Sequence, residues 1–407
     1  MPIPAPPMET AATPAGAGNG TPPTTDQGQP TQSWPNARGG HGPMKPARTR
    51  LPALLSAVAV AALGATTLAT PATANTFTLT VAAGQPPAAL PSLAMVRDFF
   101  IPEVDRRLEE SGTGYSIRWR EAYAGALLQP QAMLQGIADG IADIGYIPTL
   151  FYPDRLPLEQ VSLMAPFCTD DLTAVTAAMA QLYEDIPAMA EQYDAANQVR
   201  LAGSGVDSYH IFATSPIRSL EDLDGKRIGA AGASLAWLRG TPVAPVQSNM
   251  MEYYNSTRTG VYDGFIVMAS TIPGMRYPEA APYINAVDFG AMYAVALSMN
   301  RDSLARLPQE VQDIIAEVAL EWGEVSDEAY MTAGETGLAA LPGFEGAQVI
   351  ELPQEERVRW AEAMPNIARE WAERQDAAGL PGTEVLEAYM AALAAAGVAC
   401  ARDWSAD

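Results

Sequence analysis

The apolar positions early in the folded part of the chain predict three strands separated by two helices. Short runs of β-branched and aromatic residues at Phe77–Val81, Tyr115–Trp119 and Ile144–Ile147 have the composition of strands. Between them, Leu93–Leu108 repeats apolar side chains at three- and four-residue steps, and Gln129–Ile141 is a second helical stretch. This order is typical of a parallel sheet with helices on its faces.

The segments that follow these strands are the first candidates for a binding site. Ligands of parallel sheets bind beyond the carboxyl ends of the strands. We therefore place Gly84–Pro87, Tyr123–Gly125 and Tyr146–Thr149 on the ligand-facing rim of a first lobe.

Strand-like runs continue further along the chain and predict a second lobe. A helix is expected over residues 249–259, and the strand-like Ala294–Met299 is expected to return the chain to the first lobe. The strands that lead to the second lobe or form it are Val199–Gly203, His210–Thr214, Lys226–Ile228 and Phe265–Met268.

The last third of the chain is predicted to be helical. A long helix opens at Pro308, and its apolar stripe runs through Val311, Val318 and Trp322. Two more helical stretches follow, over residues 354–376 and 384–395.

Together these patterns predict an α/β fold of two lobes, joined by hinge-crossing strands around a cleft that closes on a ligand. The first lobe is expected to comprise residues 75–206, completed by parts of 295–407. The second is expected to comprise residues 207–294 with part of the long helix at 308–340.

The first 74 residues have the composition of segments that precede a fold. Residues 1–43 are rich in Pro, Gly, Thr and Ala, which predicts disorder or a mis-annotated extension with Met44 as the true start. Residues 44–74 have a basic start, an apolar run and the small-residue site Ala72-Thr73-Ala74, which indicates a signal peptide cleaved near Ala74 and export to the periplasm. The alternative is a membrane-spanning helix, because the apolar run is just long enough to span a bilayer.

The balance of charge excludes some classes of partner. The chain carries 24 Lys+Arg and 47 Asp+Glu, a net charge of −23. The first 74 residues hold four of the basic and two of the acidic residues, so the remainder has a charge of 20 − 45 = −25. Phosphate backbones and anionic lipid surfaces repel such a charge, and we expect no nucleic-acid binding.

Few residues could carry catalysis or hold a metal. His41 lies before the predicted cleavage site, which leaves His210 as the single histidine of the predicted mature chain and excludes a multi-histidine metal site. Gly203-Ser204-Gly205 follows a predicted strand, but Ser208 stands where a dinucleotide-binding fingerprint needs its third glycine. We expect no enzymatic activity, no metal and no cofactor.

The two cysteines, Cys168 and Cys400, are expected to form one disulfide in an exported protein, tethering the C-terminal tail. The alternative is two unpaired thiols.

Four motifs, in order and well spaced, resemble one family. They are the segment from Gly125 to Asp143-Ile144, Ser219–Ile228 (SLEDLDGKRI), Glu252–Gly264 (EYYNSTRTGVYDG) and Met299-Asn300-Arg301 before Leu307-Pro308. The second resembles the pattern S-x-x-D-L-x-G-x-K/R-I, and the third resembles E-x-Y-x-A-L-x-x-G-V-V-D-G. Behind a secretion signal, this chain is similar to the DctP-like solute-binding proteins of TRAP (tripartite ATP-independent periplasmic) transporters. The resemblance runs through essentially all of residues 75–407.

The resemblance implies a two-lobed periplasmic receptor that closes over a small molecule. It would deliver that molecule to the small and large permease subunits of a transporter driven by an ion gradient, as a monomer or a dimer. In the family, an arginine just after the second motif commonly grips the substrate carboxylate, and this chain has Gly229 there. Arg227 is a displaced substitute or a surface charge, and Val267 replaces a residue that is often polar in the family.

Other side chains must therefore provide the ligand contacts. For each of them, a packing or surface role is the alternative to ligand binding. Aromatic candidates are Trp237, Tyr209, Tyr146 and Phe265. Polar candidates are His210, Arg239, Asp207, Gln85 and Asn249.

The ligand class stays open at this point. The resemblance favours an organic or aromatic acid first, and a neutral or cationic solute is the alternative that the missing arginine raises. A second alternative for function is a ligand sensor that acts with a membrane receptor instead of a permease.

Overall fold

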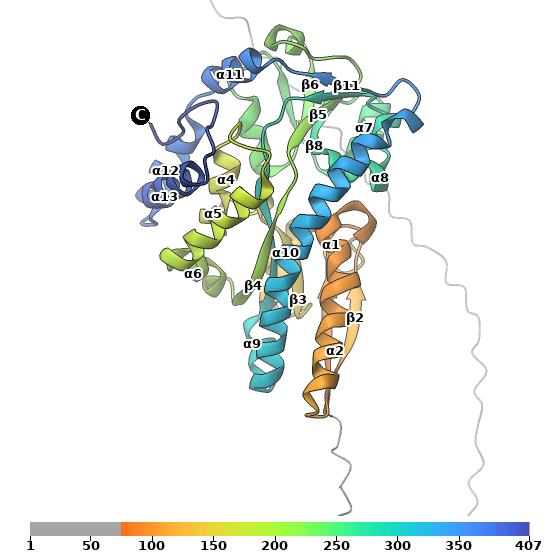
Figure 1. Ribbon diagram of the computed structural model, residues 1–407, viewed down its shortest axis with the longest axis vertical. Coiled ribbons are helices and arrows are strands. Elements are labelled where there is room, and N and C mark those ends of the chain that lie inside the picture. The colour runs from red at the N-terminus through yellow and green to blue at the C-terminus, as the bar shows by residue number, and fades with distance from the viewer. Residues whose placement is uncertain (1–74, 407) are drawn as a thin grey trace, which may run out of the picture. The chain divides into compact units, whose positions relative to one another are not determined.

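Two mixed β-sheets with helices around them organise residues 75–406, which the computed structural model describes. These residues belong to one unit by their contacts. The predicted N-terminal extension and signal peptide lie outside the described residues. The arrangement confirms the expected two-lobed α/β fold (Figure 1). The lobe boundaries at 206/207 and 294/295 remain a prediction.

The first sheet has five strands in the order β2-β1-β3-β10-β4. β1 pairs in parallel with both β2 and β3, as the strand–helix alternation predicts, whereas β10 runs antiparallel to β3 and β4. Its strands are β1 (Asn75–Ala82), β2 (Tyr115–Ala122), β3 (Ile144–Pro148), β4 (Gln198–Val206) and β10 (Met292–Asn300).

The second sheet has six strands in the order β11-β9-β5-β8-β6-β7. Only three of its strands are anticipated by the sequence patterns. Its strands are β5 (Tyr209–Ala213), β6 (Arg227–Ala230), β7 (Ala244–Gln247), β8 (Gly264–Met268), β9 (Tyr283–Ala286) and β11 (Gln348–Glu351).

Helices cover the sheets, and one expected helix is interrupted. The stretch 354–376 breaks at Met364-Pro365-Asn366, because a proline inside a helix removes a hydrogen-bond donor and clashes with the preceding turn. The helices are α1 (Pro91–Met95), α2 (Ile101–Ser111), α3 (Met133–Ala138), α4 (Val161–Met164), α5 (Leu172–Asp185), α6 (Ala188–Ala195), α7 (Met250–Arg258), α8 (Ile272–Met275), α9 (Arg301–Ala305), α10 (Gln309–Ala339), α11 (Gln354–Ala363), α12 (Ile367–Ala377) and α13 (Gly382–Ala395).

The chain passes between the sheets three times, twice through short crossing segments and once through α10, which leads from β10 to β11. The chain passes from β4 to β5 through Asp207-Ser208 and returns from β9 to β10. Figure 1 shows α10 extending from α2 and α1 toward α8, and it packs against β4 as well. The approach is close: a Cβ on Gly337 of α10 would lie 2.4 Å from the carbonyl oxygen of Ala269.

The C-terminal tail is fastened beside one crossing segment. Cys168 and Cys400 form a disulfide, and the backbone of Ala401 donates to the carbonyl of Phe167. The neighbouring backbone of Ala291, at the end of the return crossing, donates to the carbonyl of Thr169 at 2.7 Å. The tail, residues 167–169 and the crossing segment thus form one connected patch. No helix within residues 75–406 is both long and apolar enough to cross a membrane.

Candidate functional site

A cavity of about 60 Å³ lies where the two sheets face each other. At this size it holds a few water molecules. Strand ends of the first sheet, the crossing strands, α7 and α10 all contribute to its wall. The lining residues are Gln85, Leu90, Pro130, Tyr146, Pro148, Leu150, Phe151, Tyr209, Ala231, Ser234, Asn249, Met250, Met251, Tyr253, Ile266, Val267, Met268, Ala294, Val295 and Tyr330.

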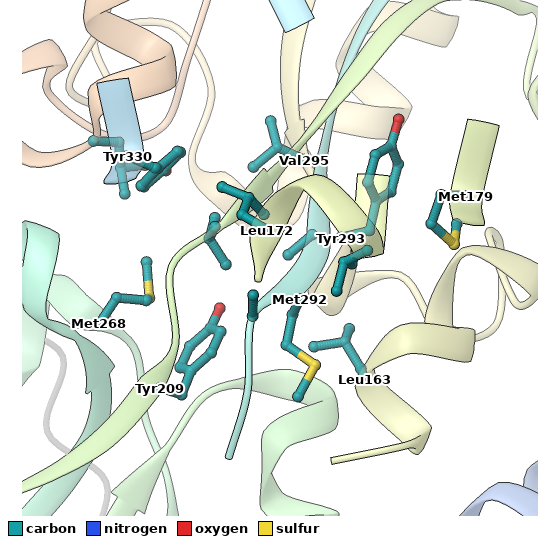
Figure 2. Packing of buried hydrophobic residues seen from close by; sticks show 14 of the residues in the cluster. Leu163, Leu172, Met179, Tyr209, Met268, Met292, Tyr293, Val295 and Tyr330 are labelled. Atoms are coloured by element: carbon teal, nitrogen blue, oxygen red, sulfur yellow. The ribbon is translucent and has the colours of Figure 1, made fainter. Parts of the chain in front are cut away.

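Aromatic, methionine and aliphatic side chains make up most of this wall. Figure 2 shows Tyr209, Met268, Val295 and Tyr330 around one region, although they come from β5, β8, β10 and α10. Methionine adapts its shape to a ligand, and tyrosine combines an apolar ring with a polar tip. The wall therefore suits a compact solute with a large apolar surface.

The cavity wall contains no acidic, basic or histidine side chain among the residues described. Its polar groups are amides and hydroxyls, and most are already engaged. Ser234 Oγ donates to the carbonyl of Ala231 at 2.7 Å, and Asn249 Oδ1 accepts from the backbone of Met251 at 3.0 Å. Tyr146 and Ser92 share a hydrogen bond of 2.8 Å between their hydroxyls.

Two buried polar atoms of the wall have no hydrogen-bond partner: Gln85 Oε1 and the hydroxyl oxygen of Tyr253. Buried polar atoms are normally paired, so each of these is a candidate contact for a bound solute. Burial raises the pKa of Tyr146 to about 12 and that of Tyr253 well above its ordinary value. The phenols therefore stay neutral at physiological pH, and the site carries no charge of its own.

The ring of Tyr262 occupies the space beside Gly229, the position where the resemblance leads us to expect a ligand-binding arginine. Gly229 lies on β6, and a Cβ built on it would meet the ring of Tyr262 at 3.1–3.3 Å. The two nearest sequence candidates for a cation are engaged elsewhere, with their side chains partly exposed. Arg227 pairs with Asp263 at 3.3 Å, and Arg239 pairs with Glu370 at 2.6 Å; neither lines the cavity.

The structure brings some of the predicted site residues together and separates others. Tyr146, Tyr209, Gln85 and Asn249 all line the cavity. Trp237 does not: it is fully buried, its Nε1 donates to the carbonyl of Leu163 at 2.6 Å, and it stacks against a neighbouring phenylalanine.

Phe265, His210 and Asp207 also lie outside the lining. Phe265 packs in the core, with its ring 4.6 Å from that of Tyr253. His210 faces Asp288, with 3.2 Å between Nδ1 and Oδ1, and burial together with the charge of Arg357 lowers its pKa to about 4. It is therefore neutral and turned away from the cavity.

Asp207 holds a crossing segment to the second lobe. Its carboxylate accepts hydrogen bonds from the backbone and the hydroxyl of Ser270, at 3.0 and 2.5 Å. Burial raises the pKa of Asp207 to about 7 despite these bonds. Asp207 thus fastens the crossing segment to the segment after β8, and it does not line the cavity.

Several wall residues carry no signal that sequence reasoning could use. Ser234 lies in a short 3₁₀ stretch and Tyr330 in the middle of a long helix, where an aromatic residue ordinarily indicates core packing. Tyr253 lies within the third motif and Met250 lies two residues before it, so the motif itself could have directed attention to this region. Within residues 75–406, no group of His, Cys, Asp and Glu is arranged to hold a metal ion.

Comparison with known proteins places this chain in a family. The profile of the bacterial extracellular solute-binding proteins, family 7 (DctP), matches residues 106–375. A solute-binding protein of Sulfitobacter sp. (strain NAS-14.1) is 22% identical over 196 residues, which is 47% of this chain and 57% of that protein. The match thus spans little more than half of the length of that relative.

Solved structures share the fold at low sequence identity. An extracytoplasmic solute receptor from Bordetella pertussis that binds pyroglutamic acid has a TM-score of 0.65 and 19% identity, covering 77% of this chain and 99% of that one. A TRAP solute-binding protein from Rhodoferax ferrireducens, with copurified benzoate, has a TM-score of 0.67 and 18% identity, covering 79% and 98%. At these identities the likeness establishes the fold alone.

Proposed function

The chain belongs to the bacterial extracellular solute-binding proteins, family 7, which are receptors and not enzymes. From this premise we propose that it captures a small, uncharged and largely apolar solute between its lobes and delivers it to a TRAP membrane permease. The proposal places the protein in the periplasm. For the solute we choose the neutral class over the organic acid that the resemblance favours first.

The observation that carries this choice is the absence of a cation from the described cavity wall. A carboxylate that leaves water for an enclosed site loses hydration worth several kcal/mol, which a paired guanidinium or ammonium normally offsets. Here the carboxylate would meet neutral hydroxyls, amides and thioethers instead. A neutral solute avoids this penalty and still buries its apolar surface against the tyrosines and methionines.

The unpaired atoms of the wall add one requirement. Gln85 Oε1 is an acceptor, so the solute that fits best carries an N–H or O–H donor. The hydroxyl of Tyr253 can then donate to an acceptor of the same solute. An aromatic amide or alcohol combines these features.

The small cavity requires the lobes to move apart for any solute larger than a few waters. The crossing segments between β4 and β5 and between β9 and β10 are where such a hinge would act. Benzoate, which copurified with the Rhodoferax ferrireducens protein, pairs a flat ring with a carboxylate. For this chain the wall offers partners for the ring and none for the charge.

Thermal unfolding of the refolded, ligand-free protein tests the proposal with matched solutes: benzoate, benzamide and benzyl alcohol. A ligand at 100 times its Kd adds about 2.7 kcal/mol. With an unfolding entropy of about 2.1 cal/mol/K per residue, this raises the Tm of the described part of the chain by about 4 °C. A rise with benzamide or benzyl alcohol and none with benzoate supports the proposal. A larger rise with benzoate than with either neutral compound contradicts it.

Delivery to a permease requires a separate experiment. Uptake of the identified solute by vesicles that contain the transporter's membrane subunits should depend on this protein. Uptake that is unchanged without it, combined with signalling through a membrane receptor, would support the sensor instead.

A further inference from the structure

The ring of Tyr262 occupies the space into which any side chain at residue 229 would project. A Cβ on Gly229 would lie 3.1, 3.2 and 3.3 Å from three carbons at the phenol end of that ring. Contacts this short are tighter than nine in ten that real Cβ atoms make, so the ring would have to shift by a few tenths of an ångström. Gly229 and Tyr262 therefore form a complementary pair, the smallest residue opposite one of the largest.

The ring has little freedom to move away. Tyr262 is 2% exposed, and its hydroxyl is 3.2 Å from Ser248 Oγ. Its ring meets those of Tyr253 and Phe265 edge-on, with centroids 6.3 and 6.5 Å away. A hydrogen bond at the hydroxyl and packing around the ring thus hold the Tyr262 side chain in place.

This pair lies next to residues of the cavity wall. Residues 229 and 231 of an extended segment face the same side, and Ala231 lines the cavity. Tyr253, which contacts Tyr262, lines it as well. In the third motif, the pattern that this chain resembles has valine where Tyr262 stands, so the bulky ring is a particular feature of this sequence.

We infer that Tyr262 is a specificity-determining residue that acts together with Gly229. Its ring fills the space that a charged side chain at residue 229 would need, and the site without that charge restricts the solute to uncharged compounds. This inference rests on the proposed function. The exclusion is steric, because any side chain at residue 229 would crowd the Tyr262 ring unless that ring moved. Removing the ring relieves this crowding.

Four proteins test the inference: the parent, Gly229→Arg, Tyr262→Val and the double variant. Gly229→Arg alone is expected to lower the Tm by about 2–4 °C, since overpacking strains the core, and to gain no affinity for an acid. The double variant is expected to recover part of that Tm and to bind benzoate at least about tenfold more tightly than the parent. Calorimetric titration with benzoate and benzamide gives the affinities.

Matched controls separate the effect of removing the Tyr262 ring from the effect of removing any other ring. Gly229→Arg combined with Tyr283→Val, which removes a ring on β9, should keep both the lowered Tm and the weak binding of benzoate. Gly229→Arg combined with Tyr262→Phe should do the same, because the ring and not the hydroxyl is the obstacle.

Three results would overturn the inference: Gly229→Arg as stable as the parent, equal benzoate binding by the single and double variants, or a folded double variant without a gain for benzoate. If the arginine variants do not fold, the pair is tested with Gly229→Ala. Its destabilisation must be relieved by Tyr262→Val, and purely additive effects contradict the pairing. The solute preference of the parent is measured independently, so a failure of the proposed function is distinguishable from a failure of this inference.

Discussion

Replacing Asp207 with asparagine should change how stability depends on pH. The side chain holds the first crossing segment to Ser270, and Gly334 of α10 covers it closely: a Cβ on that glycine would lie 3.1 Å from Asp207 Oδ2. Burial raises the pKa from 3.8 to about 7. The folded protein therefore holds a proton on this carboxyl at pH values where the unfolded chain has lost it.

The direction in which the free energy of unfolding changes with pH follows from the number of protons that each state binds. Between pH 4 and 7 the folded state binds more protons than the unfolded state, so the free energy of unfolding falls as pH rises through that window. The full shift from 3.8 to about 7 corresponds to about 4 kcal/mol. Part of the residue's surface reaches solvent, which screens the effect, and we expect about 1 kcal/mol between pH 5 and 8.

Urea unfolding of the parent and of Asp207→Asn at several pH values between 5 and 8 measures this difference. The stability of the parent relative to the variant should fall by about 1 kcal/mol across the series. Groups present in both proteins, including the buried His210, contribute equally and cancel. Asp154→Asn, at an exposed position, serves as the control and should leave the pH profile unchanged. A parent–variant difference that is constant, or that rises with pH, would refute the reasoning.

Three further predictions address the tail, the core and the cavity. Replacing Cys168 and Cys400 by serine opens a loop with a sequence separation of 232 residues and should cost up to about 5 kcal/mol of stability, measured by urea unfolding; an unchanged midpoint contradicts a stabilising disulfide. Trp237→Phe loses the hydrogen bond to Leu163 and core volume, so it should lower stability by about 2 kcal/mol while leaving the order of solute preference intact in titrations; a changed order would put Trp237 in the site. Gln85→Met removes the unpaired acceptor and should weaken binding of benzamide about tenfold without lowering the Tm of the free protein; equal affinity would exclude Gln85 as a contact.

The periodicity of the sequence predicts the longer elements of this fold well. β1, β3, β10 and α10 all appear where the apolar pattern places them, because each buries a continuous apolar face. The four-residue strands β7, β9 and β11 were not predicted. β7 and β11 are the edge strands of the second sheet and expose most of their residues, so neither has the apolar run that predicts a strand.

The candidate site was predictable only in part, since a sequence indicates a strand more readily than the direction of its side chains. Tyr209 and His210 are adjacent on β5 and both were candidates, yet Tyr209 lines the cavity and His210 turns away to Asp288. Trp237 was also an aromatic candidate, and it lies in the core. The consequence of Gly229 needed the structure, because Tyr262 is 33 positions away in the chain.

The acidity of the chain and the neutrality of its cavity both disfavour an anionic solute. Residues 75–407 have a net charge of 20 − 45 = −25, which repels an approaching anion over a distance of about 10 Å at 0.1 M salt. With no cation in the described cavity wall, an organic acid would meet unfavourable electrostatics both on approach and on binding. For an uncharged solute neither effect operates, so its association rate in stopped-flow experiments should be independent of ionic strength. An association rate that rises with added salt would show that the physiological solute is an anion, and the neutral cavity would then need another explanation.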